Sequence, residues 1–273
     1  MQEHTISPPF WNLDQVPFAT IDLAQARAQE DLFYLTAAAS FVEIATDLYA
    51  DNLIQYFSGS DDVVDWLQNT WKNEEVRHGR VLREYVRHVW PEFDWEHAYA
   101  DFFADYSRRC TVDALESTRS LEMVARCVVE TGTATFYQAL ATQASEPILS
   151  GIAAHIRADE INHYKHFYGY FGMYSASESP RRLQILGALK RRVLEARNDD
   201  ADCALWHVFI ASQTQKSTDK AAFRALRARL REQTRQHYPV AMTAKMLLKP
   251  LHLPGAVTRL IHPSLTWIAR RLM

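Results

Sequence analysis

The feature that most constrains this fold is a pattern of glutamate and histidine that occurs twice along the chain. In each occurrence a single glutamate stands among apolar residues, and a Glu-x-x-His pair follows it, 32 residues later in the first and 30 in the second. The residues are Glu43, Glu75 and His78, and then Glu130, Glu160 and His163. Residues three apart share one face of an α-helix, so both members of a pair can reach one target. The pattern therefore predicts helices whose polar side chains converge.

Convergence of these side chains predicts a metal site. A buried carboxylate is unfavourable unless it is paired or binds a cation, and Glu43 and Glu130 stand in the apolar stretches SFVEIA and CVVETGTA. One glutamate from each of two helices, with one Glu-x-x-His from each of two others, is the arrangement of ferritin-like di-iron proteins. Carboxylate and imidazole donors without a thiolate favour iron, with manganese as the alternative. The competing interpretation is a coincidence of surface salt bridges, which the joint pattern disfavours.

The scarcity of helix-breaking residues predicts an all-α fold. Eight glycines are few for 273 residues, and long stretches contain no breaker. The expected helices cover residues 23–57, 63–89, 95–109, 112–143 and 148–174. The four long ones fit a ferritin-like four-helix bundle with a di-metal centre in its core. We divide the chain into a wrapping segment, 1–19, the bundle, 20–176, and an additional basic helical region, 177–273, packed on the bundle.

Cysteine usage and hydropathy exclude several classes of protein. Cys110, Cys127 and Cys203 form no Cys-x-x-Cys pair, so the sequence indicates no zinc ribbon, rubredoxin-type site or disulfide framework. The N-terminal stretch MQEHTISPPFWNLDQ lacks the basic and apolar regions of a signal peptide. No apolar run approaches the roughly 20 residues of a membrane span. We therefore expect a cytoplasmic protein without a transmembrane segment.

Charge is distributed unevenly along the chain. Residues 1–180 hold 12 Lys and Arg against 27 Asp and Glu, whereas residues 181–273 hold 18 against 6. The basic region suggests an acidic partner or an anionic surface. Its densest cluster is Arg181, Arg182, Lys190, Arg191 and Arg192. The alternative, of equal weight, is that the two oppositely charged parts pack on each other. The apolar tail, 245–273, is expected to pack on the bundle or on a second copy of the chain.

The stretch WKNEEVRHG, residues 71–79, resembles a segment of a known family. It is similar to the Trp-x-x-Glu-Glu-x-Arg-His-Gly helix of the soluble acyl-acyl-carrier-protein desaturases, within the ferritin-like di-iron carboxylate superfamily. ADEINH, 158–163, resembles that family's Ala-Asp-Glu-x-Arg-His segment, with Asn162 in place of arginine. ETGTATF, 130–136, resembles its Glu-x-Ala-Thr segment. The resemblance covers about residues 30–175 and leaves the basic region unmatched.

The resemblance implies a role for each residue of these motifs. The six residues of the repeated pattern would be the metal ligands, with Glu75 and Glu160 bridging the two irons. Trp71 and Arg77 would surround the ligands. Thr133 would be catalytic, beside the oxygen-binding side of the metals. The alternative for Thr133 is an ordinary helical threonine that bonds its own backbone.

The acids that directly precede the two Glu-x-x-His pairs also receive roles from the resemblance. Asp159 would hold the free nitrogen of His78, and Glu74 would do the same for His163. A ligating imidazole requires such a partner, because its other N–H group must be oriented.

Our first hypothesis is an oxygen-activating di-iron oxidoreductase. The family implies desaturation, or a related hydroxylation, of a fatty-acyl chain at an unactivated C–H bond. No flavin or nicotinamide fingerprint is present, so electrons would come from an external donor such as a ferredoxin-like protein or a reductase. The other expected partners are an acyl carrier protein and a second copy of the chain in a homodimer, with no nucleic acid.

Two further hypotheses remain open. A di-iron oxygenase acting on an amine, an aromatic ring or another small metabolite would be favoured by an extra histidine facing the metals. His155 is the nearest candidate, but a position five residues before Glu160 is turned about 140° from it, so we expect a surface or supporting residue. Iron storage or peroxide scavenging, as in ferritins and rubrerythrins, is disfavoured by the missing cysteine quartet. A radical-generating subunit is disfavoured because the residue two turns beyond Glu75, Leu82, is not an oxidisable tyrosine. Tyr137 is the one comparable phenol, and we interpret it as a core residue.

Overall fold

The computed structural model describes residues 11–108, 115–195, 200–213 and 219–254, and every regular element in these ranges is a helix. The prediction of an all-α fold is thereby confirmed. The N-terminal half contains η1 (Leu13–Gln15), η2 (Phe18–Thr20), α1 (Leu23–Arg27), α2 (Glu30–Ile44), α3 (Asp47–Tyr56), α4 (Asp61–Trp66), η3 (Leu67–Trp71), α5 (Lys72–Val89) and α6 (Trp95–Tyr106). The rest contains α7 (Arg119–Gln143), α8 (Pro147–Glu178), α9 (Arg182–Glu195), α10 (Asp200–Ser212), α11 (Lys220–His237), α12 (Val240–Leu248) and η5 (Lys249–Leu251).

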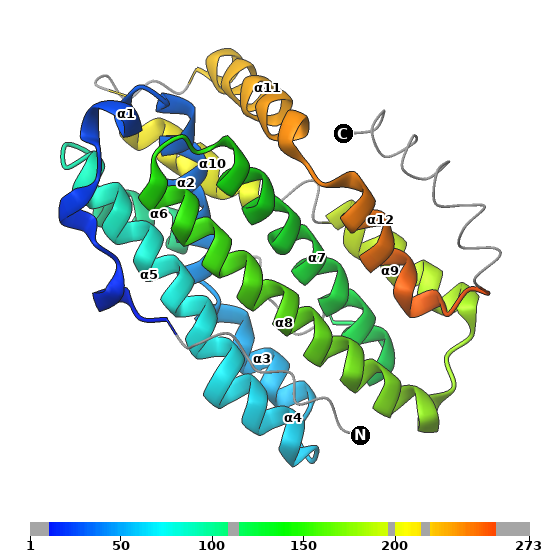
Figure 1. The fold of residues 1–273 in the computed structure, drawn as a ribbon. Coiled ribbons are helices and arrows are strands. Elements are labelled where there is room, and N and C mark those ends of the chain that lie inside the picture. Colours follow the sequence, from blue (N-terminus) through cyan, green and yellow to red (C-terminus); the bar gives the residue numbers. More distant parts are fainter. Residues whose placement is uncertain (1–10, 109–114, 196–199, 214–218, 255–273) are drawn as a thin grey trace.

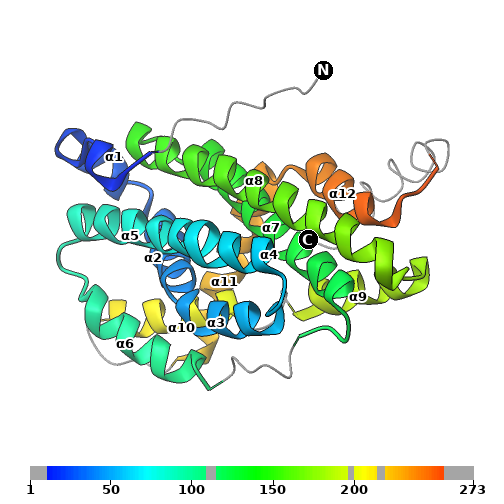
Figure 2. The same cartoon turned by 90° about the horizontal axis from the view of Figure 1, so that it is seen from below.

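Four long helices form the centre of the molecule. Helix α7 packs along α8 and α2 packs along α5, and the two pairs meet where α5 contacts α8 (Figures 1 and 2). The later helices cover this centre: α9, α11 and α12 pack against α7, whereas α10 packs against α2 and α6. Residues 1–10 of the expected wrapping segment and residues 255–273 of the expected apolar tail lie outside the described residues.

Side-chain caps fix where three of these helices begin. Asp94 accepts a hydrogen bond from the backbone of His97 at the start of α6, and Thr118 accepts one from Leu121 at the start of α7. Glu146 accepts two from the first turn of α8, whose first residue is a proline. These contacts satisfy N–H groups that have no partner inside the helix. Because Thr118 is extended, α7 starts at Arg119 and not at residue 112 as expected.

The expected helix 23–57 is wrong as a single element, because it is divided into α1, α2 and α3. The second break follows Ile44, at the point where α2 passes α5 with almost no space between the backbones. The expected helix 63–89 does run through, but it contains a π-helical stretch, η3, just before α5. Such stretches are frequent at functional sites. Helix α10 was not predicted, and residue 109, the expected end of the 95–109 helix, is not described.

The buried side chains form two hydrophobic clusters rather than one continuous core. Trp71, the last residue of η3, belongs to one cluster, and Tyr85, near the end of α5, belongs to the other. On α8 the change occurs between Ile156 and Phe167. Both Glu-x-x-His pairs lie between these positions, so a band of polar residues crosses the middle of the bundle.

Cations of the basic region pair with acids from the first 180 residues. The pairs are Arg191 with Glu116, Arg192 with Glu122, and Arg229 with Asp31. Part of the positive charge of the basic region is therefore paired with acids of the same chain, as the second interpretation of the charge distribution predicted. Arg191 and Arg192 belong to the cluster that the sequence offered to an acidic partner, and both face the chain's own carboxylates.

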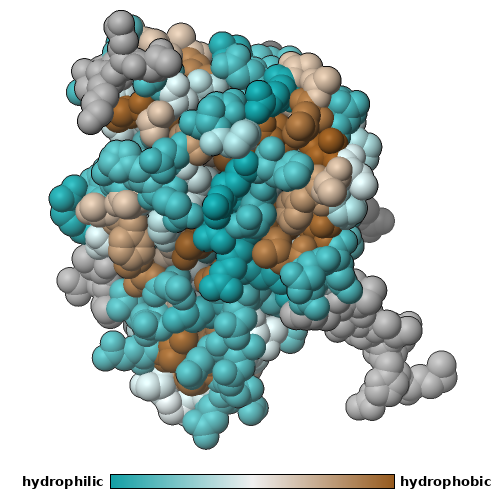
Figure 3. Space-filling model, turned by 90° about the vertical axis from the view of Figure 1, so that its left-hand side faces the viewer, coloured by the Kyte–Doolittle hydropathy of each residue, from teal (hydrophilic) through white to brown (hydrophobic). Residues whose placement is uncertain are grey.

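None of the helices in the described ranges is long and apolar enough to cross a membrane. On the face drawn in Figure 3, hydrophilic residues separate the hydrophobic areas into patches.

Candidate metal centre

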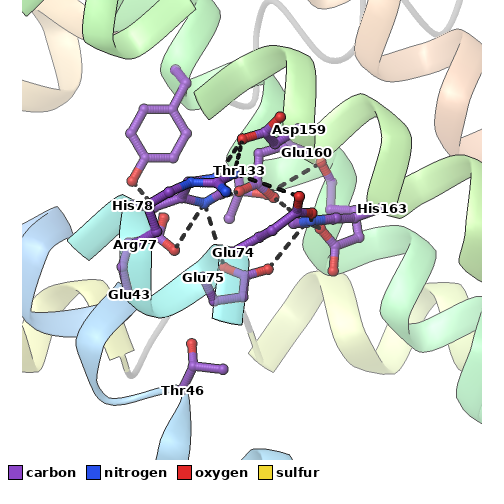
Figure 4. Close-up of polar contacts among 12 residues, drawn as sticks. Glu43, Thr46, Glu74, Glu75, Arg77, His78, Thr133, Asp159, Glu160 and His163 are labelled. Atoms are coloured by element: carbon purple, nitrogen blue, oxygen red, sulfur yellow. Dashed lines mark hydrogen bonds and ion pairs between the residues drawn. The ribbon is translucent and has the colours of Figure 1, made fainter. Parts of the chain in front are cut away.

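Six residues from four helices converge in the polar band. Glu43 comes from α2, the first Glu-x-x-His pair from α5, Glu130 from α7 and the second pair from α8 (Figure 4). All six are buried. Their ligand atoms form two groups, each with all its atoms within 4.8 Å of one another. One group is Glu43, Glu75, His78 and Glu160, and the other is Glu75, Glu130, Glu160 and His163. Glu75 and Glu160 belong to both groups, as bridging ligands would.

Gly79 allows α2 to bring its glutamate to the site. A Cβ atom at this position would lie 2.4 Å from Ile44 Cγ1, 2.7 Å from Ile44 N and 3.0 Å from Glu43 Cβ. Only a residue without a side chain permits this approach, since real Cβ contacts are longer. The glycine that follows His78 in the sequence motif therefore has a packing role.

Each histidine has one nitrogen facing the shared space and the other held by an acid. His78 Nε2 lies 3.0 Å from Asp159 Oδ2, and its Nδ1 lies 3.1 Å from Glu160 Oε1. His163 Nε2 lies 2.9 Å from Glu74 Oε2, and its Nδ1 lies 3.2 Å from Glu75 Oε1. The structure thus places both acids against the histidines that the resemblance implied. With Nε2 donating to the acid, Nδ1 is left as a lone-pair donor to a metal.

A small network holds Asp159 in place. Its Oδ2 atom accepts hydrogen bonds from Trp11 Nε1 at 2.8 Å and from Arg77 at 2.9 Å, besides the contact with His78. Burial opposes the charged form of Asp159, but these partners lower its pKa below the ordinary value. Arg77 also lies 3.5 Å from Glu74, so it connects the two acids that orient the histidines.

Two hydroxyl groups donate to the clustered carboxylates. Thr133 Oγ1 lies 2.6 Å from Glu160 Oε2, and it also lies 3.3 Å from two carbonyl oxygens of the preceding turn. The backbone bond and the contact with the cluster therefore coexist. Tyr137 Oη donates to Glu43 Oε1. This tyrosine is buried, as the sequence suggested, but it also contacts a candidate ligand.

Burial makes the charges of this cluster difficult to maintain. Burial and the neighbouring Glu160 raise the pKa of Glu75 to about 7, and burial raises the pKa of Glu130 to about 8. Burial opposes the charged form of His78, but contacts with Asp159 and Glu160 outweigh it and raise its pKa to about 9. Without a cation, Glu75 and Glu130 thus tend to hold protons, which a bound divalent cation would displace. Burial also opposes the charged form of Glu160, but its contacts with His163 and His78 outweigh burial and lower its pKa well below the ordinary value.

Several ligand atoms have no hydrogen-bond partner. Among the described residues, four buried atoms of the cluster form no hydrogen bond of acceptable geometry: His78 Nδ1, Glu130 Oε2, Glu160 Oε1 and His163 Nδ1. Buried polar atoms are nearly always satisfied by protein, water or an ion. Four unsatisfied atoms within one cluster therefore match a site that holds cations.

Other candidate residues lie further from the cluster. Trp71 is buried and packs edge-on against Phe167. His155 is exposed, stacks on Trp11 and belongs to neither ligand group. Cys127 is also in neither group, and burial raises the pKa of its thiol. Trp11 was not recognised from the sequence, which contains no local signal that places it against Asp159.

We expect that Asp159→Asn and Glu74→Gln each lower metal affinity by about 10- to 100-fold, because both keep the side-chain shape but remove the charge that orients an imidazole. Affinity is measured by competition with a chelator of known strength. Glu84→Gln, on the same helix as Glu74 but outside both groups, serves as the control. Unchanged affinity in both test variants would mean that these acids do not support the site.

Comparison with protein-family models finds no match for this chain, and a search among curated proteins finds no match either.

Proposed function

We propose that the central helices form a ferritin-like bundle that binds two iron ions. The single observation that carries this is the pair of four-residue groups sharing Glu75 and Glu160. The four carboxylates carry four negative charges when ionised, which two divalent cations would neutralise in a buried site. The unsatisfied atoms of the cluster supply donors for both ions.

Iron is favoured by the chemistry of the donors. Carboxylate oxygen and imidazole nitrogen suit iron and also manganese, whereas zinc sites with a structural role are usually rich in thiolate. The ligand groups of this cluster contain no cysteine among the described residues. The repeated Glu and Glu-x-x-His pattern on four helices is also that of the di-iron and di-manganese carboxylate proteins.

The proposed reaction is the oxygen-dependent oxidation of an unactivated C–H bond in a fatty-acyl chain. When bound, two ferrous ions supply the reduction of dioxygen and the oxidising power for C–H cleavage. In a desaturation, two adjacent CH₂ groups each lose one hydrogen and form a C=C bond. Dioxygen takes up these hydrogens, two electrons from an external donor and two protons, giving two water molecules. The related hydroxylation inserts one oxygen atom and releases one water.

The side chains of this protein have three tasks in that proposal. Asp159 and Glu74 hold the two imidazoles, and the apolar clusters on either side of the polar band exclude water. Thr133 Oγ1 lies 2.6 Å from Glu160 Oε2 and donates its hydroxyl hydrogen bond to that oxygen, which fixes the orientation of this carboxylate. The resemblance to the desaturases supports the acyl substrate.

The position of His155 bears on the alternative substrates. An extra histidine facing the metals would favour an amine oxygenase, but the nearest candidate, His155, is exposed and stacks on Trp11. We therefore retain the acyl-chain oxidase as the proposed function.

An acyl carrier protein is the proposed substrate carrier. Arg181, Arg182 and Lys190 remain exposed beside the leucines of α9, of which Leu183 is 80% exposed. A basic surface of this kind complements an acidic carrier, and added salt screens the attraction. Higher ionic strength should therefore raise KM for a carrier-bound substrate and leave KM for the same acyl chain on an uncharged thioester nearly unchanged.

The test offers acyl chains in both forms to the full chain, loaded with Fe²⁺ and supplied with dioxygen, NADPH, ferredoxin and ferredoxin reductase. We expect mass spectrometry to detect an acyl product that has lost two hydrogens or gained one oxygen. Thr133→Val should lower the rate at least about tenfold at unchanged iron content. Failure to form any product from either substrate would contradict the proposal, and growth of a mineral iron core would favour iron storage instead.

A further inference from the structure

A second group of metal-binding side chains lies outside the bundle cluster. Asp105 comes from the last turn of α6, and Cys203 and His207 come from α10, which packs against α6 (Figure 2). One ligand atom from each residue lies within 4.8 Å of the others. The two α10 residues are four apart, so they face the same side of the helix. This group shares no residue with the cluster of the four central helices.

The distances within this group fit tetrahedral coordination. Cys203 Sγ and His207 Nε2 each lie 3.5 Å from Asp105 Oδ2. With ordinary zinc bond lengths and tetrahedral angles, a sulfur–oxygen separation of about 3.5–3.7 Å and a nitrogen–oxygen separation of about 3.3–3.5 Å are expected. A charge-assisted hydrogen bond between imidazole and carboxylate would be about 2.7–2.9 Å. The observed nitrogen–oxygen separation therefore matches shared coordination better than direct hydrogen bonding.

The surroundings of Asp105 also suit a metal. Its Oδ1 atom accepts a hydrogen bond from Arg108 at 3.1 Å, and its Oδ2 atom lies 3.5 Å from both Cys203 Sγ and His207 Nε2. Cys203 is buried, whereas the side chains of His207 and Asp105 are 15% and 31% exposed. Solvent can therefore supply a water molecule as the fourth ligand.

We propose that Asp105, Cys203 and His207 form a second, mononuclear metal site that takes Zn²⁺. Thiolate, imidazole and carboxylate together are donors that zinc accepts in tetrahedral sites. The ion joins α10 to α6 and so fastens the basic region to the bundle. The sequence did not indicate this site because Asp105 is about 100 positions from the other two ligands and no Cys-x-x-Cys pair marks it.

Co²⁺ tests the proposal because it replaces zinc and gives an absorption band when a thiolate binds it. The bundle cluster contains no sulfur ligand, so the band reports this site alone. We expect metal-free full chain to show a saturable thiolate–cobalt band that Zn²⁺ abolishes. His207→Ala and Asp105→Asn should each weaken Co²⁺ binding at least about tenfold, since even removal of an outer partner of a ligand has such an effect.

Matched variants separate the possible sources of the band. Cys203→Ser should eliminate it, whereas Cys110→Ser/Cys127→Ser, which keeps Cys203 as the only thiol, should retain it. Glu75→Ala should also retain it, because the bundle cluster is separate. Circular dichroism of each metal-free variant checks the fold. The proposal is overturned if the wild type gives no band, if Cys203→Ser keeps it, or if folded His207→Ala and Asp105→Asn bind Co²⁺ as the wild type does.

Discussion

Replacing Glu75 by alanine is expected to abolish binding of both metal ions in the bundle rather than one of them. The carboxylate belongs to both ligand groups, and only three candidate ligands remain in each group without it. Its loss would also remove one of the four carboxylates whose negative charges would balance the two proposed ions. After reconstitution and desalting, the number of metal ions bound in the bundle of each chain should therefore fall from two to none. Metal bound at the proposed Asp105 site is measured separately, by the thiolate–cobalt band.

Two further variants make this result specific. Glu43→Ala and Glu130→Ala each change only one group, so each should lose one ion more readily than the other. Glu84→Ala, on α5 but in neither group, should keep both. Full metal content in Glu75→Ala would contradict the proposed bridging role and with it the binuclear site.

Gly79→Ala is expected to lower both the stability of the fold and the affinity of the metal site. The added Cβ would meet the backbone nitrogen of Ile44 at 2.7 Å, and backbone cannot rotate away as a side chain can. Overpacking of this kind reduces the free energy of unfolding by about 1–3 kcal/mol. Because Glu43 directly precedes Ile44, the same displacement moves a candidate ligand away from His78. Denaturant unfolding and chelator competition measure the two effects.

Gly151→Ala is the matched control. It also lies inside a long helix of the bundle, but a Cβ there would meet no atom within 4 Å. Alanine is the better helix former by roughly 1 kcal/mol, so this variant should be as stable as the wild type or more so. Equal behaviour of the two glycine variants would show that the close contact between α2 and α5 is not required.

Much of the candidate site could be predicted from the sequence because it depends on helical periodicity. Residues three apart share a face in any α-helix, so Glu75 and His78 had to point in one direction once their segment was helical. The same holds for Glu160 and His163. The lone carboxylates were recognisable from their apolar neighbours, because burial without a partner is unfavourable.

Helix boundaries were less predictable. The pattern of residues 23–57 is helical throughout, yet the chain divides into three helices there. The break after Ile44 coincides with the close approach of α5, a contact across more than 30 positions that no local propensity describes. The start of α7, in contrast, depends on a local contact. The side chain of Thr118 accepts a hydrogen bond from the backbone of Leu121, and threonine is a residue that commonly caps a helix in this way.

The sequence by itself determined the helical class and the set of groups available to bind metal, since both follow from the order of residues within single helices. Only the tertiary structure decided which groups meet. Trp11 reaches Asp159 across 148 positions, and Tyr137 reaches Glu43 across 94. Asp105 meets Cys203 in the same way across 98. Such contacts depend on how whole helices pack, and helix packing is set by the summed fit of many apolar side chains rather than by any short motif.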